Sequence, residues 1–211
     1  MIKNDFSFFK NRTERANFIK TKFGKYIDES KSILDVGCSD NDLKKIAGEK
    51  VFGIDIAGTP DKKVDLEKES LSMFSDNSFD FIVCTEVLEH IDNLYEVLDD
   101  MNRVSKKYML ISLPNCPDIW KVLRIALTGR TGKFYSLPQE KPEDRHKWFF
   151  SWKELDEFFE NYCQRNNFKI KEKFLHFNYA QSFRELLIKT FLKILPMKSF
   201  AQNYWILIEK K

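Results

Sequence analysis

The sequence of 211 residues predicts an α/β fold, in which helices cover both faces of a largely parallel sheet. Short apolar runs alternate along the chain with amphipathic segments, as strands joined by crossover helices require. The first two runs, residues 32–36 and 51–56, each carry an acid and a glycine at or near their ends. A glycine turn after a buried strand brings free N–H groups to a ligand, and an acid ending the second strand lies where a ribose is bound in a βαβ site. The pair therefore predicts a nucleoside site.

Hydrophobic periodicity and turn residues place the remaining elements. Ser151 and Glu154 form the pattern of a capping box, so a helix begins there. Pro114 is expected to end the strand before it. The expected elements are helices at 11–28, 40–48, 92–104, 151–166 and 181–195, and strands at 31–36, 51–56, 64–66, 79–84, 108–113, 168–176 and 204–208.

Composition indicates a globular protein, since 43% of the residues are apolar and 32% are charged. The net charge of +3 is too small to indicate nucleic-acid binding by itself. Both ends of the chain are basic, with eight Lys and Arg against four acids in residues 1–31 and six against two in residues 184–211. The four cysteines form no CxxC pair. We expect neither a signal peptide nor a membrane-spanning segment. We expect a cytoplasmic protein of one domain, residues 1–211.

Residues 114–148 interrupt the alternation of strands and helices. This segment contains several prolines, two glycines and many charges, and connections of this length are usually functional. We therefore expect it to form an insertion on the substrate side of the domain. The segment 181–200 combines apolar residues with Arg and Lys, so it is either a helix packed beside the last strand or a peripheral membrane contact.

Seven stretches follow one another along the chain: residues 35–41, Asp55, Asp65-Leu66, residues 79–84, residues 86–91, Arg103-Val104 and residues 110–112. In this order they resemble a class I S-adenosylmethionine-dependent methyltransferase. The resemblance implies a Rossmann-like, seven-stranded, mostly parallel sheet with an antiparallel last strand and an insertion after the fifth strand. It implies S-adenosylmethionine as the cofactor. In such a protein, Asp55 holds the ribose hydroxyls and Asp65 meets the adenine amino group. The cofactor-binding residues that the resemblance implies are Asp35, Gly37, Cys38, Ser39, Asp55, Ile56, Asp65, Leu66, Thr85 and Glu86.

The glycine loop departs from the family pattern, because Ser39 and Asn41 replace the later glycines. Asn tolerates a positive φ, so Asn41 can keep the turn. Ser39 adds a side chain near the methionine moiety of the cofactor. This departure keeps open a third interpretation, in which the chain is a non-catalytic nucleoside-binding scaffold.

The candidate catalytic residues are His90, His146 and Glu89. An α-helix would place Glu86, Glu89 and His90 on one face, and His146 would complete a set suited to a divalent metal ion. That set resembles the small-RNA 3′-terminal 2′-O-methyltransferases and, in part, the ubiquinone-pathway O-methyltransferases. The alternative, which we favour, is a metal-free site in which a histidine acts as base or hydrogen-bonds near the substrate.

The acceptor is expected to be a hydroxyl on a glycan, a nucleotide sugar or a related small molecule. Residues 134–138 and 142–150 resemble methyltransferases associated with bacterial surface-polysaccharide clusters. Tyr135, Arg145 and Trp148 are the expected acceptor residues, since aromatic rings stack on sugars and cations bind anionic groups. Metal-dependent 2′-O-methylation of RNA is the competing enzymatic hypothesis. The third histidine, His176, falls in an apolar strand and is expected to be structural.

Overall fold

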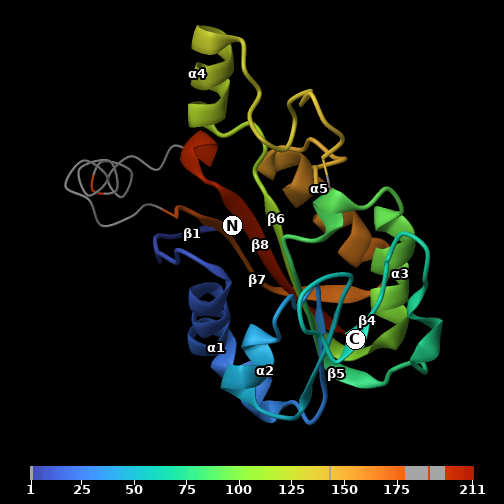
Figure 1. Cartoon of the computed structure of the whole chain (residues 1–211). Helices are drawn as coiled ribbons and strands as arrows, with labels where there is room; N and C mark the ends of the chain where they lie inside the picture. The colour runs from blue at the N-terminus through green and yellow to red at the C-terminus, as the bar shows by residue number, and fades with distance from the viewer. Residues whose placement is uncertain (1, 143, 179–189, 191–197) are drawn as a thin grey trace.

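The computed structural model describes residues 2–142, 144–178, 190 and 198–211, and these form one mixed sheet with helices on both faces (Figure 1). Among the described residues the strand order is β4-β3-β2-β5-β6-β8-β7-β1. The strands are β1 (Lys3–Asp5), β2 (Ile33–Val36), β3 (Val51–Asp55), β4 (Lys62–Lys63), β5 (Phe79–Thr85), β6 (Ser105–Pro114), β7 (Phe168–His176) and β8 (Asn203–Lys210); the helices are α1 (Arg12–Glu29), α2 (Asp42–Ala47), α3 (Leu94–Val104), α4 (Ile119–Thr128) and α5 (Trp152–Arg165), with short 3₁₀ helices η1 (Leu71–Met73), η2 (Leu88–His90) and η3 (Lys198–Phe200).

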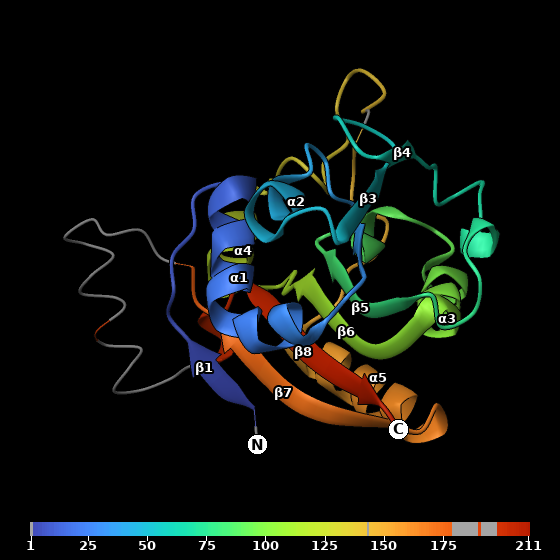
Figure 2. The same cartoon turned by 90° about the horizontal axis from the view of Figure 1, so that it is seen from below.

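Two apolar cores lie on the two faces of the sheet. Figure 2 shows α1 and α2 on one side and α3 and α5 on the other. Strand β8 supplies both cores, because successive side chains of a strand point to opposite faces. Tyr204 enters the core beneath α3 and α5, and its neighbour Trp205 enters the core beneath α1. Trp205 stacks there on Phe174 with ring centroids 5.9 Å apart. A strand this apolar on both faces belongs inside the sheet rather than at an edge.

Most of the sheet agrees with the sequence-based expectations. The pairings β2–β3, β2–β5 and β5–β6 are parallel, and β8 runs antiparallel to β6 and β7. Helix α5 begins after Ser151 with the expected capping box. Elsewhere the ends of the elements differ by a few residues from the expected ends, as for β6, which includes Pro114 because its last residue still pairs with Asn203.

Two expectations about strands were wrong. The described residues form eight strands instead of seven, because β1 pairs in parallel with β7 at the edge of the sheet. The three residues of β1 are polar, so the sequence has no apolar pattern that predicts this strand. Residues 64–66 do not form the expected strand. The strand in that region is β4, which comprises Lys62 and Lys63 and so begins two residues earlier in the chain.

The expected helix at 181–195 lies outside the described residues, apart from Thr190. None of the helices among the described residues is long and apolar enough to cross a membrane.

His176 has the structural role expected for it. Its side chain is fully buried, and its ring stacks on Phe9 with centroids 4.6 Å apart. Its Nε2 lies 2.9 Å from the carbonyl oxygen of Ser7, so Nε2 carries the proton and donates it. This contact ties the N-terminal segment to β7, and burial lowers the pKa of His176.

We predict that His176 makes the protein less stable in mild acid. The unfolded chain takes up a proton at its His near pH 6.5, whereas the folded chain resists it, so this contribution is present above that pH and is lost as the pH falls below it. Urea unfolding at pH 7.5 and pH 5.0 measures the effect. The loss of unfolding free energy between the two should be smaller in His176→Asn than in the unmodified protein. An equal loss in both would contradict this role.

Candidate active site

Three parallel strands end side by side at one edge of the sheet. Val36 of β2 pairs with Ile54 of β3 and with Cys84 of β5. The residues that follow these positions therefore emerge together. Gly37, Asp55 and Thr85 are brought to one edge in this way, and it is the edge where α/β proteins bind ligands.

Gly37 is required by the packing of this edge. Its φ is +76°, which a side chain disfavours, and a Cβ there would lie 2.1 Å from Cγ2 of Val87. The loop after β2 thus packs directly against the chain that follows β5. Any larger residue at this position would push the two segments apart.

The loop keeps the conformation of a glycine loop although two of its residues are not glycine. Ser39 and Asn41 both have a positive φ, of 53° and 57°. The backbone N–H of Ser39 donates to Oδ2 of Asp55 at 2.7 Å, and Arg12 donates to the Ser39 hydroxyl. The Asn41 amide donates to the carbonyl of Thr59 at 2.9 Å. These contacts offset the cost of the left-handed backbone and hold the loop across the end of β3.

A small cavity opens between this loop and α1. Asp35, Gly37, Cys38 and Thr85 line it, and Arg12 and Arg15 face it from α1. Burial raises the pKa of Asp35 to about 7, although the nearby Arg15 acts in the opposite direction. Asp35 lies within β2, so it does not cap α2, whose N-cap is Asn41.

The remaining expected cofactor residues follow β3 and β4. Asp65 accepts from the N–H of Glu67 at 3.1 Å and pairs with Lys68 at 2.7 Å. The Lys68 pair and the N–H of Glu67 lower the pKa of Asp65 although partial burial opposes them. Leu66 is buried, whereas Ile56 is 63% exposed beside this edge. Ile56 thus places an exposed apolar side chain next to Asp55, where it can contact a ligand at this edge.

A larger cavity of about 490 Å³ adjoins this edge. Glu86, Glu89 and His90 line it from the chain after β5. Tyr135 and His146 line it from the insertion 114–148. Residues of the segment 114–148 therefore form part of the wall of this cavity.

The expectation that Glu86, Glu89 and His90 share one helical face was wrong. Glu86 has a φ of +58°, which breaks the chain direction, and only η2 follows it. The carboxyl group of Glu86 turns to Ser112, whose hydroxyl donates to its Oε1 at 3.1 Å. Burial raises the pKa of Glu86.

The structure nevertheless brings together three of the four expected metal ligands. Glu89, His90 and His146 each offer one ligand atom, and these atoms lie within 4.8 Å of one another. His90 Nε2 lies 3.7 Å from Glu89 Oε1. On the other side of the ring, His90 Nδ1 lies 2.6 Å from Asp144 Oδ1. Sequence reasoning missed Asp144, although its position two residues before His146 could have suggested it.

Burial governs the protonation of Glu89 and His146. The Glu89 carboxylate is 1% exposed, and neither oxygen has a hydrogen-bond partner among the described residues. Burial and the neighbouring Glu86 raise its pKa well above the usual range. Burial and the neighbouring His90 lower the pKa of His146 to about 4, so its imidazole is neutral at pH 7. The hydroxyl of Tyr135 lies 2.8 Å from His146 Nδ1 and fixes the orientation of that ring.

The segment from His146 to Phe150 is pinned across the end of the sheet by backbone contacts. The N–H of Lys147 donates to the carbonyl of Glu89 at 2.8 Å, and the N–H of Cys116 donates to the carbonyl of Phe150 at 3.0 Å. Trp148 Nε1 donates to the carbonyl of Ile91 at 2.7 Å. Lys147 also forms ion pairs with Glu67 and Asp92. These bonds hold His146 opposite His90.

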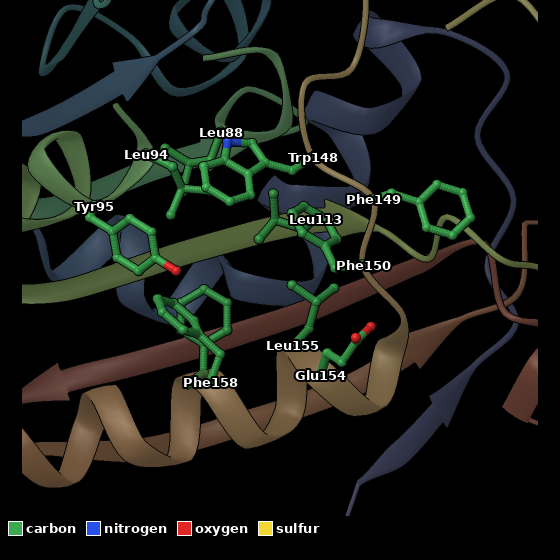
Figure 3. Close-up of a pocket in the computed structure, with 11 residues that line it drawn as sticks. Leu88, Leu94, Tyr95, Leu113, Trp148, Phe149, Phe150, Glu154, Leu155 and Phe158 are labelled. Carbon is green, nitrogen blue, oxygen red and sulfur yellow. The ribbon is translucent and has the colours of Figure 1, made fainter. Parts of the chain in front are cut away.

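The three expected acceptor residues occupy different places. Tyr135 lines the large cavity, whereas Arg145 is exposed. Trp148 lines a separate apolar pocket of about 190 Å³ between α3 and α5, together with Tyr95 and Phe158 (Figure 3). Trp148 thus anchors the insertion to the core as well as bordering a pocket.

The methyltransferase domain family matches residues 8–172, which is most of the chain. The chain belongs to this family. Among curated proteins none matches the sequence. The acids Asp35 and Asp55 and the small cavity beside Gly37 lie at the edge formed by β2, β3 and β5, which is where α/β proteins bind ligands. The cofactor of this methyltransferase is S-adenosylmethionine.

Solved structures with the same fold include several methyltransferases. An S-adenosylmethionine-dependent methyltransferase from Archaeoglobus fulgidus has a TM-score of 0.61 and 19% identity, with 95% of each chain covered. The methyltransferase domain of bacterial CtHen1 has a TM-score of 0.60 and 11% identity, with 94% of this chain and all of that chain covered (100%). Magnesium protoporphyrin IX methyltransferase from Synechocystis, with bound S-adenosylhomocysteine, has a TM-score of 0.55 and 10% identity, with 97% of this chain and 90% of that chain covered.

We predict that the variant Ser39→Gly has a higher free energy of unfolding than the variant Ser39→Ala. Both Ser39→Gly and Ser39→Ala lose the contact with Arg12, so they differ in the backbone alone. A left-handed conformation costs a residue with a Cβ about 1–2 kcal/mol. Urea unfolding should therefore find Ser39→Gly more stable than Ser39→Ala by about 1 kcal/mol, after the entropy of glycine in the unfolded chain is included. The reverse order would show that residue 39 is not left-handed in solution.

We also predict that Glu89 lowers the stability of the fold. An acid with a raised pKa costs stability as the pH rises above about 4.5, because the unfolded chain then releases its proton more readily. At pH 8, with a chelator present, Glu89→Gln should be more stable than the unmodified protein, because the amide has no proton to release on unfolding. This difference in the free energy of unfolding should shrink towards pH 5. The exposed Glu96→Gln is the matched control and should show no such pH-dependent gap, and a destabilised Glu89→Gln at pH 8 would contradict the prediction.

Proposed function

We propose that this methyltransferase transfers the methyl group of S-adenosylmethionine to a hydroxyl of a glycan, a nucleotide sugar or a related small molecule. The observation that carries the proposal is the arrangement of Asp144, His90, Glu89 and His146 around one cavity. An alcohol holds its proton tightly, so its methylation needs a group that takes the proton. A histidine oriented by a carboxylate is such a group.

The cofactor would bind along the edge formed by β2, β3 and β5. In this proposal Asp55 accepts from the ribose hydroxyls, because a carboxylate that already accepts two N–H bonds still has free lone pairs. Asp65, Ile56 and Leu66 would border the adenine, and Asp35, Gly37, Cys38, Ser39, Thr85 and Glu86 would surround the methionine moiety. Bound there, the cofactor supplies an electrophilic methyl carbon on a sulfonium.

His90 is the proposed general base. The carboxylate of Asp144, whose Oδ1 lies 2.6 Å from Nδ1 of His90, would favour a proton on Nδ1 and leave Nε2, on the side of Glu89, as the basic nitrogen. With the cofactor bound, the acceptor oxygen would take the methyl group as the C–S bond of the cofactor breaks, and Nε2 of His90 would take up the hydroxyl proton. S-adenosylhomocysteine and the methyl ether are the products. Tyr135, which lines the cavity, would contact the acceptor, whereas Arg145 and Trp148 would act from its surroundings.

We predict that His90→Gln lowers kcat for methyl transfer about 10²–10⁴-fold, because the reaction loses its base. Asp144→Asn should lower kcat by a smaller factor and leave the Kd for S-adenosylmethionine unchanged. Transfer of tritiated methyl groups to a panel of glycans and nucleotide sugars measures the rates, and calorimetry measures the Kd.

The exposed Asp99→Asn is the control for Asp144→Asn and should retain full activity. A His90→Gln variant with unaltered kcat would exclude His90 as the base. Tight cofactor binding without turnover on any acceptor would instead favour a nucleoside-binding scaffold.

A second candidate function is metal-dependent 2′-O-methylation of RNA. It is favoured by the convergence of Glu89, His90 and His146, since one carboxylate and two imidazoles suit a divalent ion. The buried Glu89 oxygens, which have no hydrogen-bond partner among the described residues, also fit a ligand role. A metal ion held there would make the acceptor hydroxyl more acidic.

Chelation separates the two candidates. The metal-free mechanism predicts that dialysis against EDTA leaves methyl transfer intact. Metal-dependent RNA methylation predicts that EDTA abolishes transfer, that Mn²⁺ restores it, and that Glu89→Ala and His146→Ala are both inactive. An oligoribonucleotide whose acceptor 2′-hydroxyl is replaced by hydrogen is the control for the RNA reaction.

A further inference from the structure

Cations line the large cavity of the candidate active site from two sides. Arg12 and Arg15 of α1 also line the small cavity between α1 and the loop after β2, so they stand beside the proposed cofactor site. The other cations are Lys121 and Arg124 of α4 and Lys133 of the turn that follows α4. Figure 1 shows α4 beyond the end of β6. The cations on the α4 side are therefore the ones available to an acceptor.

Two of the cations on the α4 side lack a counter-ion. Neither Arg124 nor Lys133 forms an ion pair with any residue that the structure describes. Lys121 differs, because its Nζ lies 2.9 Å from a carboxylate oxygen of Asp118. Residues 119–139 contain no acidic residue that could supply a local partner. The α4 side of the cavity thus carries two uncompensated positive charges.

The three acids that line the same cavity make contacts elsewhere. Glu86 accepts from the hydroxyl of Ser112 at 3.1 Å. Asp144 lies 2.6 Å from Nδ1 of His90, and the side chain of Glu89 is buried. A bound anion could therefore reach the two cations of the α4 side without displacing an ion pair that the structure describes.

Packing holds both cations at the wall of the cavity. Gly132 has a φ of +94°, and a Cβ there would overlap Nη2 of Arg124, so the guanidinium lies directly against the backbone of the turn. Nζ of Lys133 lies 5.2 Å from the centre of the Phe134 ring. That ring in turn stacks on His146 with centroids 4.3 Å apart. One turn thus connects both charges with the catalytic end of the cavity.

We propose that Arg124 and Lys133 form a subsite for a phosphate group of the acceptor. A guanidinium offers paired N–H donors that match two phosphate oxygens, and an ammonium adds a compact charge. Two unpaired cations match the charge of a phosphate monoester or a diphosphate better than the single charge of a carboxylate. A cavity wall of one charge sign also attracts such a ligand from solution.

This inference rests on the proposed function and narrows its acceptor to a phosphorylated compound, either a sugar phosphate or a nucleotide sugar. The phosphate would bind on the α4 side of the cavity. The hydroxyl that receives the methyl group would lie on the side of His90, across the ring stack of Phe134 and His146.

Calorimetric titration with inorganic pyrophosphate tests the subsite. The full-length protein is saturated with S-adenosylhomocysteine, so that the cofactor site is occupied, and EDTA is present to exclude binding through a metal ion. We expect pyrophosphate to bind, and to bind more weakly at high salt. Arg124→Gln should weaken binding about tenfold, and Lys133→Gln several-fold, because each removes one charged donor. Neither variant should change the Tm or the Kd for S-adenosylhomocysteine.

Arg130→Gln is the matched control for both variants. Arg130 is an exposed cation of the same segment, but it does not line the cavity. Its substitution should leave the Kd for pyrophosphate unchanged.

Methyl transfer gives a second readout. Each sugar phosphate or nucleotide sugar that accepts a methyl group is compared with the same compound without its phosphate. Arg124→Gln should raise the KM for the phosphorylated acceptor about tenfold and change kcat much less, because the phosphate is bound away from the reacting hydroxyl.

Four results would overturn the proposal. The first is an absence of pyrophosphate binding, and the second is binding that Arg15→Gln removes while Arg124→Gln and Lys133→Gln leave it intact. The third is an equal KM for acceptors with and without phosphate. The fourth is methylation of a single-stranded oligoribonucleotide that displaces pyrophosphate, which would assign the subsite to an RNA phosphate.

Pyrophosphate binding needs no methyl transfer. Its failure beside efficient transfer to a neutral glycan would remove the subsite and leave the proposed function. Binding that depends on Arg124, without transfer to any hydroxyl compound, would retain the subsite and contradict the proposed function.

Discussion

The parallel pairing of β2 with β3 and β5 is the constraint on which the site depends. Because Val36 is in register with both Ile54 and Cys84, the loops after all three strands start at the same level. Gly37 can then pack against Val87, and the N–H of Ser39 can reach Asp55. A shift of one residue in either pairing would turn every side chain of a strand to the other face and separate these groups.

The second feature of the site is a carboxyl group held out of water. Glu89 is buried beside Glu86, and the segment 146–150 is fastened over it by the bond from Lys147 to the Glu89 carbonyl. The same segment places His146 opposite His90. The fold thus accepts an unfavourable carboxyl group at one position and fixes it with backbone bonds, as expected where stability is traded for function.

The parts of the site that obey local rules could be predicted from sequence. Asp55 ends an apolar run, and Asn41 occupies a left-handed position that its residue type tolerates. The break at Glu86 could not be predicted, because a positive φ at Glu arises from the packing of Val87 on Gly37 and the bond to Ser112. The contact between Asp144 and His90 joins segments more than fifty residues apart, so no local pattern in the sequence could predict it. Strand β1 was missed for a related reason, since its pairing with β7 is made by backbone groups.

In the proposed reaction, cofactor and acceptor meet where the end of β5 faces the insertion. A crystal structure with S-adenosylhomocysteine tests this most directly. We predict that the ribose hydroxyls bind Asp55 and that the sulfur faces the cavity lined by Glu89, His90 and His146. A sulfur directed away from this cavity, with these three residues out of reach of any acceptor, would contradict it.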